Sequence, residues 1–386
     1  MDEIALVTYS TKPRGGVVHT LALAEALVAG GVPVHVITLG EPGSGFYRET
    51  TAPFTVIPAP PYADTLEERV FASVDALERG LRTFGGRFAL VHTQDCISAR
   101  AAARVRDAGK GPLVVRTVHH IDDFTTKALV DCQRQAVLEP DQVLVVSEMW
   151  RGLLQTEFGV NADVVHNGVD VERFVPITPA YRAELRSRVG VRDRFLFLAV
   201  GGIEPRKGSI YLFEALATLR KTLKSPPIVA IIGGHSFQDY RQYRNEAMAK
   251  LEQLGLVVGH DVVELGTVPE AEMAAWYRAA DALAFPSTKE GFGLAVLEAM
   301  SAELPVVTSD LPVFREYLLA GRDALMAPVG DAEALADAMR VLATDAQVRR
   351  DLVAAGRRLA RRFSWAATAA EHRAIYSRLL RPARIA

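Results

Sequence analysis

Two glutamates in the last third of the chain flank a pair of glycines. Seven residues separate Glu290 from Glu298, and Gly291-Phe292-Gly293 lies between them. The residues from Leu294 onward are good helix formers, so we expect these glycines where the free N–H groups of a helix N-terminus face outward and attract an anion. Carboxylates repel phosphate but accept hydrogen bonds from hydroxyl groups. The pattern therefore predicts a ligand that carries both groups, such as a nucleotide sugar, although a glycine loop before a solvated helix face is the alternative.

Two adjacent cations stand at another expected helix entrance. Arg206 and Lys207 follow the apolar run 195–200 and precede Gly208. At the first turn of a helix they could neutralise a diphosphate leaving group. The lysine precedes the last glycine, so the order is not that of the phosphate-binding loop of nucleoside triphosphatases. Exposed basic residues on a helical turn would give the same sequence.

Glycines and histidines follow two expected strands of the first half. Gly15 and Gly16 come after an apolar run, where a loop could approach a phosphate or a sugar closely. His119 and His120 follow another such run. The glycines would also suit a tight turn without a ligand, and the histidines could make ordinary polar contacts. The dinucleotide fingerprint Gly-x-Gly-x-x-Gly is absent from the first of these loops, which counts against a nicotinamide cofactor.

These motifs resemble those of glycosyltransferase family 4, whose members are retaining enzymes of the GT-B fold. The resemblance rests on Glu-x7-Glu with its inner Gly-Phe-Gly and on the sequence Arg206-Lys207-Gly208. It implies that Glu298 holds the ribose hydroxyls of a nucleotide sugar and that Glu290 holds hydroxyls of the donor sugar. It also implies that the leaving diphosphate lies against Arg206, Lys207 and a backbone segment made of Gly291, Phe292, Gly293 and Leu294.

The resemblance extends over most of the chain. It implies that further glycines contact the donor, namely Gly15, Gly16 and Gly233, with Gly234 beside the last. His119, with His120 as the fallback, matches a histidine near the transferred sugar. Asn167 begins an Asn-Gly-Val-Asp segment that closes the family's N-terminal domain, and we expect a structural turn there. One position departs from the pattern, because Gly202 replaces an expected arginine.

Short apolar runs alternate with helical stretches along the chain, which indicates parallel strands in doubly wound sheets. Pro176 and Pro179 interrupt this pattern and suit a linker. We therefore expect an α/β protein with two Rossmann-like domains facing across a cleft, as in GT-B enzymes. Residues 1–175 are expected to form an N-terminal acceptor-side domain, and residues 176–364 a nucleotide-sugar-binding domain. Residues 365–386 are expected to form a C-terminal helix that could cross back to the first domain.

Composition excludes several other classes of protein. The 386 residues carry a net charge of −2, so nothing attracts nucleic acid globally. Cys96 and Cys132 lack metal-ligand spacing, and the Asp122-Asp123 pair is not part of an Asp-x-Asp motif, so we predict no metal site. The acidic start is not a signal peptide, and no apolar run could span a bilayer, which favours a cytoplasmic protein.

One expected helix near the C-terminus is strongly basic. Its charge could bring it to an anionic membrane surface, although a solvated helix face is the commoner explanation. The basic residues are Arg349, Arg350, Arg357, Arg358, Arg361 and Arg362.

Together these features predict a metal-independent enzyme that moves a hexose from a nucleotide diphosphate sugar to a hydroxyl group. The acceptor would be a carbohydrate, a lipid or a small molecule, and no further cofactor is expected. The resemblance implies attack on the face from which the diphosphate departs, with retention of anomeric configuration. A disaccharide phosphorylase, a nucleotide-sugar epimerase and a non-enzymatic nucleotide-sugar sensor remain alternatives, and Gly202 gives the sensor slight support.

Overall fold

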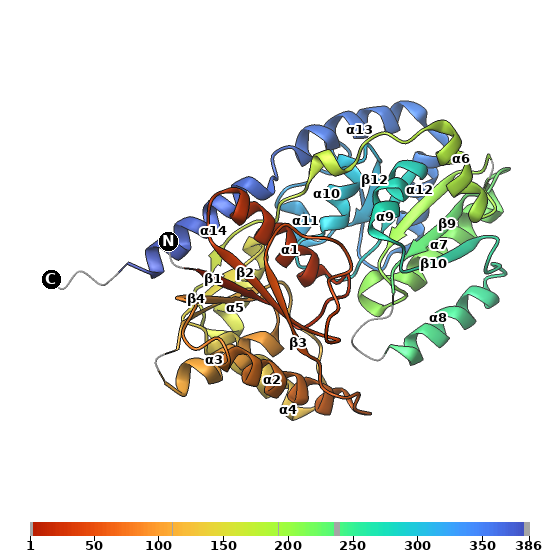
Figure 1. The fold of residues 1–386 in the computed structure, drawn as a ribbon. Helices are drawn as coiled ribbons and strands as arrows, with labels where there is room; N and C mark the ends of the chain where they lie inside the picture. The colour runs from red at the N-terminus through yellow and green to blue at the C-terminus, as the bar shows by residue number, and fades with distance from the viewer. Residues whose placement is uncertain (1–2, 110, 192, 235–239, 382–386) are drawn as a thin grey trace. The chain divides into compact units, whose positions relative to one another are not determined.

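The computed structural model describes residues 3–109, 111–191, 193–234 and 240–381 (Figure 1). Contacts divide the chain into two compact units. The first unit combines the residues up to Gly168 with those from Trp365 on, and the second unit runs from Val169 to Ser364. Each unit contains a parallel sheet with helices on its faces, so the doubly wound α/β prediction is confirmed.

The first unit is built on a sheet of seven strands. These are β1 (Ile4–Val7), β2 (Val34–Gly40), β3 (Phe54–Pro58), β4 (Leu90–Thr93), β5 (Leu113–Val118), β6 (Gln142–Val145) and β7 (Asp163–Val164). Their order in the sheet is β3-β2-β1-β4-β5-β6-β7, and every pair is parallel. All four residues of β1 are buried, because a central parallel strand has helices on both faces and needs a continuous apolar sequence.

Six helices of the described chain belong to this unit. They are α1 (Gly15–Ala29), α2 (Leu66–Arg82), α3 (Cys96–Asp107), α4 (Lys127–Leu138), α5 (Glu148–Phe158) and α14 (Trp365–Leu379). Helices α1 and α14 lie side by side, and α2, α3 and α4 lie together on the other side of the sheet (Figure 1). The end of the chain therefore completes the core of the unit in which the chain begins.

The second unit has a sheet of six strands. These are β8 (Leu196–Val200), β9 (Ile228–Ile232), β10 (Val262–Gly266), β11 (Ala282–Phe285), β12 (Val306–Ser309) and β13 (Leu325–Ala327), in the parallel order β10-β9-β8-β11-β12-β13. The helices are α6 (Pro179–Arg188), α7 (Ser209–Thr222), α8 (Arg241–Gln253), α9 (Glu270–Ala279), α10 (Leu294–Ser301), α11 (Pro312–Arg315), α12 (Ala332–Thr344) and α13 (Ala346–Ala360). Two short 3₁₀ turns, η1 (Val171–Arg173) and η2 (Pro205–Lys207), precede β8 and α7.

The strand order reverses between β8 and β11 in the second unit, as it does between β1 and β4 in the first. Ligands of such sheets bind beyond the carboxyl ends of the strands at this switch point. The loops that leave β8 and β11 carry the predicted cations and Glu290, so the fold brings them to one place.

The second unit begins a few residues before the expected linker. Phe174, directly after η1, is buried, and its ring packs edge-on against Tyr277 of α9 at 5.6 Å. This contact draws residues 169–175 into the second unit. The remaining stretch up to Thr178 is irregular, and Thr178 then caps α6 by accepting a hydrogen bond from the Tyr181 N–H.

Among the described residues, no helix combines the length and the apolar character needed to cross a bilayer.

Candidate functional site

The loop after β8 is held against the loop after β11. In η2, the carbonyl of Arg206 accepts a hydrogen bond of 2.8 Å from the N–H of Thr288. Thr288 Oγ1 donates to the carbonyl of Pro205 at 3.3 Å. Two loops from neighbouring strands are thus fixed to each other, and the predicted cations lie beside the segment that carries Glu290.

Glu290 forms an ion pair with the predicted lysine. Lys207 Nζ donates to Glu290 Oε1 at 2.6 Å, and Ser287 Oγ donates to the same oxygen at 2.9 Å. Arg206 Nη1 lies 3.8 Å from it, while Arg206 Nε donates to Glu204 Oε2 at 3.1 Å. The structure therefore brings the predicted cations and the first glutamate of Glu-x7-Glu into one cluster.

This cluster is almost removed from solvent. The exposed side-chain fractions of Lys207 and Glu290 are 14% and 9%. Burial acts to raise the pKa of the Glu290 carboxyl, but the charges of Lys207 and Arg206 outweigh it and hold the pKa below its ordinary value. Burial lowers the pKa of Lys207, against the attraction of Glu290. The ammonium also lies 4.5 Å from the centre of the Phe285 ring, a cation–π contact that fixes it further.

Helix α10 begins beside these residues. Its N-cap is Gly293, with a φ of 87°, and no side chain caps the first N–H groups among the described residues. A Cβ at Gly293 would lie 2.3 Å from Cε1 of Phe314, so only glycine fits. The predicted start at Leu294 is correct, and Gly291 precedes it in the partly exposed loop. Phe292 is buried and stacks on Tyr317, so only its backbone could serve a ligand.

The glycine pairs after β8 and β9 approach each other closely. A Cβ at Gly202 would lie 2.6 Å from the carbonyl oxygen of Gly234, and a Cβ at Gly233 would lie 2.4 Å from the carbonyl carbon of Gly201. Gly201 N–H also donates to Ile232 O at 2.7 Å. This backbone contact explains why Gly202 cannot carry the expected arginine, since any side chain there would push the β9 loop away.

Glu298 lies on α10 and has partners that sequence reasoning did not identify. Tyr277 Oη donates to Glu298 Oε2 at 2.7 Å, and Arg173 Nη1 lies 3.6 Å from Oε1. Neither partner belongs to a sequence motif. Tyr277 is a core residue of α9, and Arg173 lies in η1.

The predicted residues of the first unit also come together. Gly15 and Gly16 are the first residues of α1 rather than part of a loop, because the carbonyl of Arg14 already accepts from the Val18 N–H. The expectation that these two glycines lie in a loop is therefore wrong. A Cβ at Gly16 would lie 3.8 Å from Cδ2 of His119, so the glycine and the predicted histidine are neighbours.

His119 belongs to a cluster of four histidines that the sequence did not reveal. His119 Nε2 donates to Gln94 Oε1 at 3.0 Å, and its ring meets that of His19 at 4.6 Å. His19 Nδ1 donates to Oδ1 of the predicted Asn167 at 2.8 Å. The remaining members, His92 and His372, have rings 5.4 Å apart.

All four of these histidines have lowered pKa values. Burial, helped by the nearby His120 and Arg116, lowers the pKa of His119 to about 3. Burial lowers the pKa of His372 to about 4. Burial also lowers the pKa values of His19 and His92, with their histidine neighbours adding to the effect. The cluster therefore holds neutral rings at physiological pH.

No group of three His, Cys, Asp or Glu side chains that could hold a metal ion occurs in the described part of the chain. His120 Nε2 lies 3.3 Å from Asp122 Oδ1, but no third ligand joins them there.

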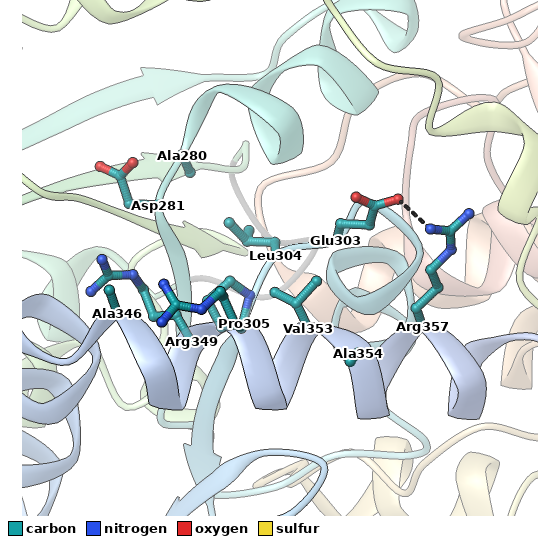
Figure 2. A pocket seen from close by; sticks show the side chains of 11 residues that line it. Ala280, Asp281, Glu303, Leu304, Pro305, Ala346, Arg349, Val353, Ala354 and Arg357 are labelled. Carbon is teal, nitrogen blue, oxygen red and sulfur yellow. Dashed lines mark ion pairs between the residues drawn. The ribbon is translucent and has the colours of Figure 1, made fainter.

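A groove of about 520 Å³ lies elsewhere in the second unit. Figure 2 shows that α13 forms one wall of this groove, with Arg349, Val353 and Arg357 along it. Ala280 and Glu303 precede β11 and β12, so the groove lies at the amino ends of the strands, away from the candidate site at their carboxyl ends. Arg357 pairs with Glu303 at 3.2 Å, so part of the basic surface of α13 is neutralised internally.

Two family models match the chain. One, described as glycosyl transferases group 1, matches residues 182–359, and the other, described as glycosyltransferase family 4, matches residues 13–173. The chain is 30% identical over 377 residues to a phosphatidyl-myo-inositol mannosyltransferase of Mycobacterium leprae, covering 95% of this chain and 94% of the relative. It is 31% identical over 405 residues to a D-inositol 3-phosphate glycosyltransferase of Frankia alni, covering 97% of each.

Solved structures of the same fold are also similar. Sucrose-phosphate synthase from Thermosynechococcus elongatus superposes with a TM-score of 0.81 at 22% identity, covering 98% of this chain and 99% of that one. Anabaena HepE in complex with UDP-glucose superposes with a TM-score of 0.78 at 19% identity, covering 97% and 99%. These similarities show the GT-B fold.

Proposed function

Because this chain belongs to glycosyltransferase family 4 and is a glycosyltransferase, we propose that its donor is a nucleotide diphosphate sugar and that it transfers a hexose with retention. The observation that carries the proposal is the cluster of Arg206, Lys207 and Glu290 beside the start of α10. It combines fixed positive charge, free helix N–H groups and a carboxylate at the switch point of the second sheet.

Arg206 and Lys207 have the chemistry to stabilise a departing diphosphate. Negative charge grows on the diphosphate as the glycosidic bond breaks, and cations that are already in place need no rearrangement. Lys207 is held by Glu290 and by the Phe285 ring. The N–H groups at Gly293 and Leu294 would add hydrogen bonds to the phosphate oxygens.

The two glutamates would hold hydroxyl groups of the donor. Glu290, fixed by Lys207 and Ser287, would accept from a hydroxyl of the sugar, and Glu298 from the ribose. In the proposed reaction the acceptor hydroxyl attacks from the face that the diphosphate leaves. The diphosphate takes the proton, so no carboxylate acts as a nucleophile, unlike in a retaining glycosidase.

The acceptor would contact the first unit, where Gly16 and His119 are neighbours. One relative is named for phosphatidyl-myo-inositol and another for D-inositol 3-phosphate. We propose an inositol-bearing acceptor for this chain too. His119, neutral at pH 7 because its pKa is about 3, would contact the transferred sugar through hydrogen bonds rather than through charge.

The test begins with a thermal-shift screen of UDP-, GDP- and ADP-sugars, because a ligand at 100 times its Kd adds about 2.7 kcal/mol of stability. The hit is then incubated with inositol, inositol 3-phosphate or phosphatidylinositol, and nucleoside diphosphate release and the anomeric configuration of the product are measured. We expect acceptor-dependent release and a retained anomer. Breakdown that depends on inorganic phosphate would indicate a phosphorylase, donor binding without turnover would indicate a sensor, and an inverted anomer would contradict retention.

Activity in the presence of a chelator tests metal independence. We expect full turnover in EDTA. A loss restored by Mg²⁺ or Mn²⁺ would contradict this expectation and return Asp122 and Asp123 as candidates.

A further inference from the structure

The carboxylate of Glu298 lies beside Tyr277 and Arg173, two residues that have no role in the proposed function. Its Oε2 accepts a hydrogen bond of 2.7 Å from Tyr277, and Arg173 Nη1 lies 3.6 Å from its Oε1. The exposed side-chain fraction of Glu298 is 16%, so the carboxylate can still meet a ligand. Tyr277 is completely buried. The hydrogen bond from the buried Tyr277 hydroxyl therefore fixes the orientation of the partly exposed Glu298 carboxylate.

The Tyr277 hydroxyl can only donate to Glu298. Burial raises the pKa of the phenol well above its ordinary value, and the negative charge of Glu298 raises it further. The phenol therefore keeps its proton, and one lone pair of Oε2 is used. Arg173 at 3.6 Å is beyond hydrogen-bond length, so it attracts Oε1 without occupying its lone pairs.

Arg173 is itself fixed by its neighbours. Its Nη2 pairs with Glu270 Oε1 at 2.7 Å, and its guanidinium lies 5.3 Å from the centre of the Phe174 ring. Phe174 in turn packs against Tyr277. The carbonyl of Phe174 accepts a hydrogen bond of 2.9 Å from Arg278 Nε. The first turn of the second unit and α9 thus form one support beneath Glu298.

We propose that Tyr277 and Arg173 are positioning residues that hold the Glu298 carboxylate in one orientation, so that its remaining lone pairs accept from both hydroxyls of a ribose. This inference rests on the proposed function, which assigns Glu298 to the nucleotide. A fixed, partly buried acceptor rejects a ligand that lacks the matching hydroxyl, because the acceptor is then left unpaired. The pair therefore sets the preference for ribonucleotides over 2′-deoxyribonucleotides.

The experiment measures the Kd of UDP, GDP and ADP and of their 2′-deoxy counterparts by titration calorimetry, on the full-length protein. For the nucleotide that the unmodified protein binds most tightly, Tyr277→Phe should raise the Kd about 10-fold. It should also reduce the preference for the ribose form at least 5-fold. Turnover at saturating donor should change less than twofold, because the cluster around Lys207 is untouched. Tyr181→Phe, on α6 of the same unit, is the matched control and should change neither quantity.

Two further variants make the outcome decisive. Arg173→Gln removes charge from a partly exposed side chain without disturbing the core, and it should reduce the ribose preference in the same direction. Glu298→Ala is the reference, since it removes the carboxylate itself. If Glu298→Ala abolishes the preference while Tyr277→Phe and Arg173→Gln keep it, the inference is overturned and the proposed function stands. If Glu298→Ala changes neither affinity nor preference, the assignment of Glu298 in the proposed function is wrong.

Discussion

At the scale of single residues, the main question is whether the ion pair of Lys207 and Glu290 serves folding or ligand binding. Both side chains are largely buried, and the pair is supported by Ser287 and Phe285. A buried ion pair adds little net stability, since desolvation offsets the attraction, and apolar replacement of both partners is often neutral. A charged pair buried between the loops after β8 and β11 is therefore better explained by a ligand than by folding.

A double-mutant cycle separates the two explanations. Glu290→Gln leaves the Lys207 ammonium buried without its counter-charge and should lower the free energy of unfolding by about 3 kcal/mol. Adding Lys207→Met, which replaces the ammonium group with an uncharged side chain of similar length, should recover most of that loss while turnover stays low. Urea denaturation measures the cycle, and equal stability of the single and double variants would contradict it.

Gly202 allows a second prediction at this scale. The arginine expected from the family resemblance would place a Cβ 2.6 Å from the Gly234 carbonyl oxygen. Gly202→Arg should therefore lower the free energy of unfolding by about 1–3 kcal/mol, the usual effect of overpacking, and should not improve donor affinity. Lys221→Arg on the exposed end of α7 is the control. Tighter donor binding at unchanged stability would show that the glycine is not required by packing.

At the scale of elements, most central strands could be predicted, because a strand that is buried on both faces needs a continuous apolar sequence. The apolar run 195–200, which contains β8, was recognised for this reason, and the start of α10 at Leu294 was predicted from the glycines that precede the helix. β13, of three residues, is too short to give a pattern. Tyr277 and Arg173 were missed because their contact with Glu298 joins elements that are distant in sequence.

Helix α14 carries His372 into the histidine cluster, and this makes the first unit sensitive to acid. The pKa of His372 is about 4 in the folded protein and about 6.5 when unfolded, so the unfolded chain takes up its proton first. Stability is therefore complete above about pH 6.5 and is lost as the pH falls toward 4. At pH 5, protonation of this single residue in the unfolded chain should lower the free energy of unfolding by about 2 kcal/mol.

The prediction is tested by urea unfolding at pH 7.5 and pH 5. His372→Leu should lose about 2 kcal/mol less than the unmodified protein between the two values, because it lacks the titrating ring. His260→Gln, which changes an exposed histidine of the second unit, should show the full loss. If His372→Leu lost as much unfolding free energy as the unmodified protein, the pKa of His372 would not be lowered in the folded state.

At the scale of the whole molecule, the chain passes twice between its units, after Gly168 and after Ser364. The first unit is thus incomplete without the end of the chain. Tyr376 and Ile375 belong to the same apolar cluster as β1 and α1. Tyr376 also forms a 2.7 Å hydrogen bond with His92 Nδ1, so α14 is part of the core of this unit.

Truncation tests this organisation. A chain of residues 1–364 should lose several kcal/mol from the first unit, since each large apolar side chain that loses its burial costs about 1.5–3 kcal/mol. The full protein, which keeps α14, is the reference. Proteolysis followed by mass spectrometry locates the loss, and equal protection of residues 3–164 in both chains would contradict the predicted role of α14.

The central claim is that Arg206 and Lys207 stabilise the leaving diphosphate, and the most direct measurement is kcat at saturating donor and acceptor. Lys207→Met and Arg206→Gln should each lower kcat about 100-fold or more, the usual effect of removing a preorganised electrostatic group, while Lys221→Met leaves it unchanged. A kcat within twofold of that of the unmodified protein in both variants would contradict the claim.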